Sequence, residues 1–153
     1  MSQVIDQLGV LVRVRGRECD RRERAFIAER REHESREAEL RRRRTELAEA
    51  TSRHEAALRL RAFSPGDALL GDYLITRRSA LDTVIQDEQR ASEDLSRSAQ
   101  ELDIARAAHR RAIVRLDVLQ DQLAIARRQE TRRLGRKQEA AAPEGQTRNG
   151  VLR

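Results

Sequence analysis

The chain has 153 residues, of which 38% are charged, 38% hydrophobic and only 2% aromatic, with a formal net charge of +6. So little aromatic bulk excludes a large globular core, and leaves either disorder or long helices that bury a narrow stripe. The good helix formers Ala, Leu, Glu and Arg dominate the chain and favour the helices. A length of this size accommodates one domain.

The cysteine content and the length of the apolar runs indicate in which cellular compartment the protein is expected. Cys19 is the only cysteine, so an intrachain disulfide and a cysteine-rich metal site are both excluded. The apolar run at residues 8–12 is too short for the core of a signal peptide and far too short to cross a bilayer. We therefore expect a cytoplasmic protein without a membrane span.

The first expected element is a helix over about residues 3–62. Two columns of residues, each repeating every seven positions, form the heptad seam along which one helix packs on another. The first column is Ile5, Val12, Cys19, Phe26, His33, Leu40, Leu47 and His54. The second column is Leu8, Arg15, Arg22, Glu29, Arg36, Arg43, Ala50 and Ala57. More than half of the second column is charged, so this helix is expected to be marginal alone.

The next expected element is a turn at about residues 63–65. It falls in the stretch "RLRAFSPGDALLGDY", residues 59–73, which contains one of the two prolines. Ser64 is a good N-cap for a following helix, and Pro65 suits the first helical position. Asp67 stands where the acid of a capping box stands.

The second expected helix covers about residues 65–134 and has a stronger seam, sustained for more than six heptads. Its large column is Leu74, Leu81, Glu88, Leu95, Leu102, His109, Leu116, Leu123 and Glu130. Its small column is Val84, Ala91, Ser98, Ala105, Ala112, Leu119 and Ala126. This pattern predicts a coiled coil. From residue 135 the seam stops, and residues 135–153 are predicted to be a disordered tail.

The two seams match when the chain folds back antiparallel about the turn, so that the numbers of facing residues sum to 131. Phe26 then faces Ala105, which pairs a large side chain with a small one. Arg43 faces Glu88, an ion pair that would fix the register. The predicted fold class is therefore all-α, a long antiparallel two-helix coiled-coil hairpin over residues 1–134 with a disordered C-terminal tail.

No catalytic or metal-binding group is expected. His33, His54 and His109 all lie on seam columns, and the first two are about 30 Å apart along one helix, too far to share a metal. No glycine-rich phosphate loop and no nucleophile elbow occurs in the chain. We therefore expect no enzyme activity, no cofactor and no metal.

Charge is distributed unevenly along the hairpin. Residues 1–31 have eight Arg against five acidic residues, and residues 106–134 have eight Arg against three. Residues 32–105 have 12 Arg against 16 acidic residues. The end of the hairpin that holds the chain termini is therefore predicted to be basic, and the rest weakly acidic. This asymmetry favours different partners at the two ends.

The start of the chain, residues 1–47, combines an apolar run with Arg ("LGVLVRVRGR") and continues as Arg- and Glu-rich helix. In this pattern, in length and in the mid-chain turn, it resembles the FliJ/YscO (SctO) family of type III secretion proteins. That resemblance implies an antiparallel helical hairpin that acts as the central stalk of the hexameric secretion ATPase. It also implies contact with the cytoplasmic domain of the export gate and with export chaperones, on the cytoplasmic side of the inner membrane.

With this resemblance, two sets of residues become candidate partner contacts. The first set, at the terminal end, would meet the ATPase ring, and its members are Val10, Leu11, Arg13, Val14, Arg17, Arg127, Arg128 and Arg132. The second set consists of apolar residues beside the turn that would dock on the export gate, namely Phe63, Leu69, Leu70 and Tyr73.

Two other classes of function stay open. A nucleic-acid-binding coiled coil is suggested by the sequence pI of about 10.9 and by the run of Arg at residues 41–44. The shortage of aromatic residues for base stacking, and the acids interleaved with the Arg, make nucleic acid the weaker candidate. A generic scaffold coiled coil from another assembly is the third reading.

Overall fold

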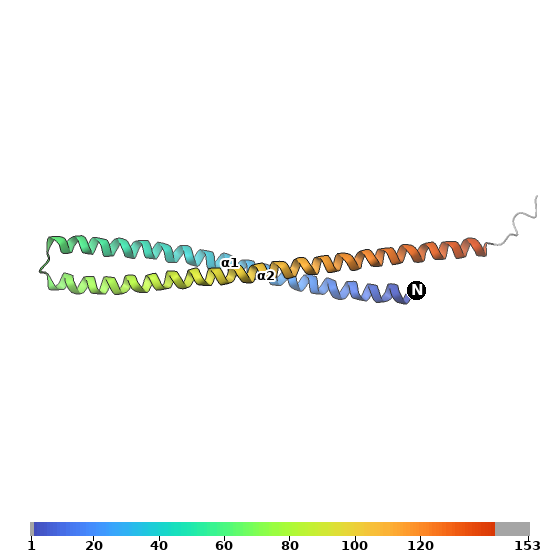
Figure 1. Ribbon diagram of the computed structural model, residues 1–153, viewed down its shortest axis with the longest axis horizontal. Helices are drawn as coiled ribbons and strands as arrows, with labels where there is room; N and C mark the ends of the chain where they lie inside the picture. Colours follow the sequence, from blue (N-terminus) through green and yellow to red (C-terminus); the bar gives the residue numbers. More distant parts are fainter. Residues whose placement is uncertain (1, 143–153) are drawn as a thin grey trace, which may run out of the picture. The chain divides into compact units, whose positions relative to one another are not determined.

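The computed structural model describes residues 2–142, which form two helices joined by a short turn (Figure 1). Helix α1 covers Ser2–Phe63 and helix α2 covers Ala68–Ala141. The predicted all-α helical hairpin is thus confirmed. Contacts divide the chain into a turn unit, residues 23–108, and a terminal unit, whose described parts are residues 2–22 and 109–142.

Within the turn unit, α1 and α2 pack in the predicted antiparallel register. Ion pairs that cross between the helices join Arg36 to Asp94, Arg43 to Asp87 and Arg44 to Glu88. The residue numbers in these pairs sum to 130, 130 and 132, on either side of the predicted 131. Both members of the predicted apolar pairs Leu40–Ala91 and Ala57–Leu74 are buried as well.

Burial follows the predicted seam in both units. Every residue of the first column of α1, and of both columns of α2, is buried or half-buried. Among the described residues, all eight that are buried lie on seam columns: Leu40, Ala57, Leu74, Ala91, Ser98, Leu102, Ala112 and Leu123. In the charged column of α1, Arg22 and Arg36 are exposed, because a long guanidinium side chain can leave the seam for water.

The predicted ion pair between Arg43 and Glu88 is replaced by two neighbouring pairs. The guanidinium of Arg43 lies 3.5 Å from the carboxylate of Asp87, and that of Arg44 lies 3.5 Å from Glu88. Arg43 also donates hydrogen bonds to Glu39 and Glu46 on its own helix. The seam position turns this long side chain toward the flank of α2, where Asp87 lies, and so Glu88 takes its partner from the next residue of α1.

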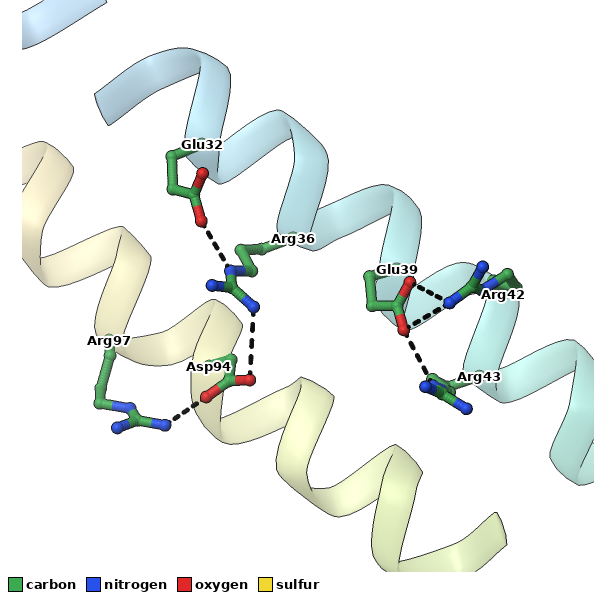
Figure 2. A network of polar contacts seen from close by, with 7 residues as sticks. All are labelled: Glu32, Arg36, Glu39, Arg42, Arg43, Asp94 and Arg97. Atoms are coloured by element: carbon green, nitrogen blue, oxygen red, sulfur yellow. Dashed lines mark hydrogen bonds and ion pairs between the residues drawn. The ribbon is translucent and has the colours of Figure 1, made fainter. Parts of the chain in front are cut away.

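A polar network covers this part of the turn unit (Figure 2). Arg36 donates to Glu32 at 2.9 Å and pairs with Asp94 across the helix interface, and Asp94 also accepts from Arg97. Hydrogen bonds from Arg42 and Arg43 hold the pKa of Glu39 below its usual value. Those contacts stabilise the fold above the ordinary carboxyl pKa, and the contribution is lost as the pH falls through the lowered value.

The turn uses a different cap from the predicted one. Helix α2 begins at Ala68, and the Oδ1 atom of Asp67 accepts hydrogen bonds from the amides of Leu69 at 3.0 Å and Leu70 at 3.3 Å. Asp67, not Ser64, is therefore the N-cap. The amide of Asp67 donates to the carbonyl of Ser64, which closes a four-residue turn with Pro65 in its favoured second position.

Helix α2 also ends later than predicted, at Ala141 instead of about residue 134. The end of the seam at residue 135 is not the end of the helix, because residues 136–141 are nearly all good helix formers. In the register of the hairpin the first residue of α1 faces residue 129, so residues 130–141 extend beyond α1 (Figure 1). The rest of the predicted disordered tail, residues 143–153, lies outside the described residues.

The register predicts a specific crosslink between Leu47 and Val84, which are both half-buried in the turn unit. In a Cys19→Ser background, Leu47→Cys combined with Val84→Cys should form an intrachain disulfide on oxidation, detected by gel mobility without reductant. Leu47→Cys combined with Thr83→Cys is the matched control, since Thr83 is exposed. Crosslinks only between chains would contradict the antiparallel hairpin.

Stability should depend on the seam far more than on the outer faces. Leu102 is 8% exposed, and Leu102→Asp should cost about 2–5 kcal/mol for the lost leucine, with the buried carboxylate adding to it. Most helical circular dichroism should disappear in this variant. The exposed control Arg53→Asp should melt like the wild type. Equal melting of the two variants would show that Leu102 is not part of the packed interface.

The capping geometry gives a third prediction. Asp67→Ala should lower the free energy of unfolding by about 1 kcal/mol, because two amides of the first turn of α2 lose their acceptor. Asp67→Asn should retain most of the stability, since asparagine caps nearly as well. Chemical denaturation measures the difference. If Ser64→Ala cost more than Asp67→Ala, Ser64 would be the cap after all.

Candidate interaction surfaces

The terminal unit is strongly basic, and the turn unit is not. The described part of the terminal unit carries fourteen Lys and Arg against seven Asp and Glu. The turn unit carries sixteen Arg against eighteen acidic residues. The predicted difference in charge therefore coincides with the division into two units: the terminal unit is basic and the turn unit is slightly acidic. An acidic partner would be attracted to the terminal unit, and salt would weaken that attraction.

All eight residues predicted to contact a partner at the terminal end are exposed. The apolar members expose about half of their surface, with values of 48% for Val10, 45% for Leu11 and 50% for Val14. They remain uncovered because the seam positions of α1 face α2, whereas these residues lie at other heptad positions and point away from it. Exposed aliphatic groups next to Arg side chains suit a protein partner, which can cover the first and pair with the second.

The structure brings some of these residues together and separates others. Arg13 and Arg127 line one groove between the helices, whose other lining residues are Gly9, Val12, Gln120, Leu123 and Ala124. Two of the lining residues, Val12 and Leu123, belong to the seam, so the groove lies along the contact between α1 and α2 in the terminal unit. Leu11 and Arg13 are two residues apart and so point about 200° apart around α1. The predicted terminal set therefore surrounds the helix pair and does not form one flat patch.

An ion pair within α1 lies beside the seam of the terminal unit. The guanidinium of Arg15 donates to Glu18 at 2.6 Å. This hydrogen bond holds the pKa of the Glu18 carboxyl below its usual value, so Glu18 remains charged in mildly acidic solution. Arg15 is half-buried on the charged column, which fits an aliphatic stem lying along the interface with its charged head paired.

Sequence reasoning missed a set of exposed aliphatic residues on the outward face of α2. Val114 is 60% exposed, Val118 50% and Ile125 51%. Their spacing of four and seven residues places them on one side of the helix, and this periodicity was the available signal. This second stripe is shorter than the seam that it accompanies, so its periodicity is the weaker of the two patterns in the sequence.

The part of α2 beyond α1 is basic. A shallow concave strip on this part of α2 is lined by six residues. Four of them are basic, namely Arg132, Arg133, Arg136 and Lys137, and the other two are Gln129 and Ala140. Arg132 thus belongs to this extension more than to the paired helices. A single helix of this kind offers several guanidinium and ammonium groups to an acidic partner, or to phosphates, without a preformed pocket for either.

The predicted patch beside the turn is largely exposed. Phe63 is 87% exposed and Leu69 81%, while Tyr73 is 42% exposed and accepts a hydrogen bond from Arg77 at 3.0 Å. Leu70 is half-buried, because it lies seven residues before Arg77 and fourteen before Val84, and so continues the small column of the seam. Exposed Leu60 and Ile75 enlarge the patch.

The described surface offers charged groups and exposed apolar groups for contact with a partner. Across residues 2–142, no group of three or more His, Cys, Asp or Glu side chains is placed to hold a metal ion. None of the described helices is long and apolar enough to cross a membrane.

No protein-family model, no curated protein and no solved structure matches this chain. The likeness to the FliJ/YscO (SctO) family consequently remains a resemblance of pattern, carried by the start of α1 and by the helical hairpin.

Proposed function

We propose that this protein is a non-enzymatic central stalk of a bacterial type III secretion ATPase. In this proposal the terminal unit enters the hexameric ring and the patch beside the turn docks on the cytoplasmic domain of the export gate. The protein would act at the cytoplasmic face of the inner membrane, and export chaperones are a further class of partner. The resemblance at the start of the chain suggests this role, and the surface of the terminal unit supports it.

The observation that carries the proposal is the distribution of exposed aliphatic side chains in the terminal unit. Val10 and Val14 lie on the outward face of α1, whereas Val114, Val118 and Ile125 lie on the outward face of α2. Because α1 and α2 pack through their seams, these two faces point in opposite directions. A partner that meets the unit from one side covers only one face. A partner that encloses the unit covers both.

Charge supports the same arrangement. With fourteen basic against seven acidic residues, the terminal unit would be drawn toward acidic loops that line a ring. Arg13 and Arg127 flank one groove, while Arg17 and Arg128 lie outside it on either helix. Contacts spread around the unit in this way suit an axial position between several subunits.

The patch beside the turn supports a second contact. Phe63 and Leu69 expose more than four-fifths of their surface on either side of the turn, which is unusual for large apolar residues unless another surface covers them. The turn unit has a slight excess of acid, so its partner differs in electrostatic character from the partner of the terminal unit. The export gate is the partner that the resemblance suggests for this patch.

A nucleic-acid-binding role is the second candidate, and the basic extension of α2 favours it. Arg132, Arg133, Arg136 and Lys137 follow one another on a single helix, a pattern that binds phosphates without sequence preference. Acids are interleaved with Arg along the rest of the chain, and only 2% of the residues are aromatic. The stalk is therefore the preferred proposal.

Titration of the protein into its cognate secretion ATPase tests the proposal. Addition should raise the rate of phosphate release, because a protein that binds only the assembled hexamer stabilises it by mass action. Arg127→Glu combined with Arg128→Glu should weaken the stimulation by about threefold to tenfold, and higher salt should weaken the wild type similarly.

A matched variant separates a local effect from a change in total charge. Arg59→Glu combined with Arg61→Glu removes the same charge from exposed positions of the turn unit, and should leave the stimulation unchanged. Absence of both stimulation and co-migration with the ATPase at low salt would refute the stalk. Tight, salt-dependent binding to random DNA would then establish the second candidate.

A further inference from the structure

The outward face of α2 in the terminal unit carries a second stripe with heptad spacing. Its members are Arg111, Val114, Val118, Asp121 and Ile125, separated by three, four, three and four residues. All five are exposed. This spacing is the one that places side chains in a line along a helix that packs on another helix. The stripe thus has the geometry of a helix-packing surface, although within residues 2–142 no other helix covers it.

The second stripe lies on the far side of α2 from the seam. The seam residues Ala112 and Leu123 are buried against α1. At about 100° per residue, the centre of the second stripe lies about 150° around the helix from the centre of the seam. A partner on this stripe therefore leaves the packing of α1 on α2 unchanged.

We propose that a second copy of this chain packs antiparallel on this stripe and forms a two-fold symmetric dimer. The stripe is complementary to itself when facing residue numbers sum to 232. Val114 of each copy then faces Val118 of the other, and Arg111 of each copy faces Asp121 of the other. The two valines at the centre of the contact thus form apolar contacts twice, and Arg111 and Asp121, which flank the valines, form ion pairs twice, as an isologous interface requires.

The neighbouring registers lack this complementarity. A shift of one heptad to a sum of 225 places Arg111 opposite Val114, which leaves the guanidinium against an apolar group. A shift the other way, to a sum of 239, places Asp121 opposite Val118 and Arg111 opposite Arg128. Like charges or unpaired charges in the contact oppose both alternatives, so the stripe specifies one register.

The charged residues of the stripe are available for such a partner. Among residues 2–142, neither Arg111 nor Asp121 makes an ion pair within its own chain. The contact between two such stripes is small, so we expect a weak dimer that forms at high protein concentration. This inference does not rest on the proposed function, and its test needs no ATPase. Binding to a larger partner would displace the second copy from the same valines.

Charge reversal provides a test with internal rescue. Analytical ultracentrifugation of the full chain, with reductant present to keep Cys19 reduced, measures the dimer dissociation constant. Arg111→Asp alone should weaken the dimer at least about tenfold, and so should Asp121→Arg alone, because each places like charges opposite one another twice. The double variant Arg111→Asp/Asp121→Arg should restore the wild-type constant.

Mixing the two single variants makes the test specific for the register. The Arg111→Asp chain and the Asp121→Arg chain should form a heterodimer with both ion pairs restored, although neither self-associates. In a chain with Arg111 and Asp121 intact, Val114→Ser combined with Val118→Ser should weaken the dimer. The helical circular dichroism of this variant should equal that of the wild type. A chain that stays monomeric at all concentrations would overturn the proposal. A dimer that is indifferent to both single reversals would overturn it as well.

Discussion

The narrow seam between the two helices is the constraint on which the rest of this structure depends. Each turn of helix contributes few residues to it, and all eight buried residues of the described chain lie on it. Four of these are leucine and three are alanine, with Ser98 as the only polar one. Small side chains in one column let the helices approach, while leucines in the other fill the space. Ion pairs such as Arg36–Asp94 then hold the register at the edge of the seam.

Because the seam takes so few side chains, nearly everything else is surface, and the apolar residues on that surface carry information about partners. Val114 and Val118 are spaced for helix packing, yet both remain exposed in the described part of the chain. Phe63 and Leu69 flank a turn that requires neither for its geometry, since Asp67 caps the helix and Pro65 shapes the chain. Residues of this kind are retained at a cost in solubility, which a binding partner offsets.

The proposed ring contact and the proposed dimer use overlapping parts of the terminal unit in different states. An enclosing ring would cover the outward faces of both helices, whereas a second copy would cover only that of α2. Such a ring would offer more contact area, so the weaker contact between copies would give way to it when both are present. Dimer formation in the free protein would keep exposed valines from non-specific association while no ring is bound.

The heptad pattern is enough to predict the two helices, their antiparallel register and the residues of the seam, because heptad spacing depends only on the geometry of a helix. The sequence also identified the exposed terminal set and most of the patch beside the turn. Three further features of the structure differ from what the heptad pattern predicts. Asp67 caps α2 in place of Ser64, because the turn closes through the amide of Asp67 and the helix starts after it. Arg43 pairs with Asp87, because a long side chain reaches past the residue that faces it. Helix α2 continues past residue 134, because local propensity maintains a helix where the seam has ended.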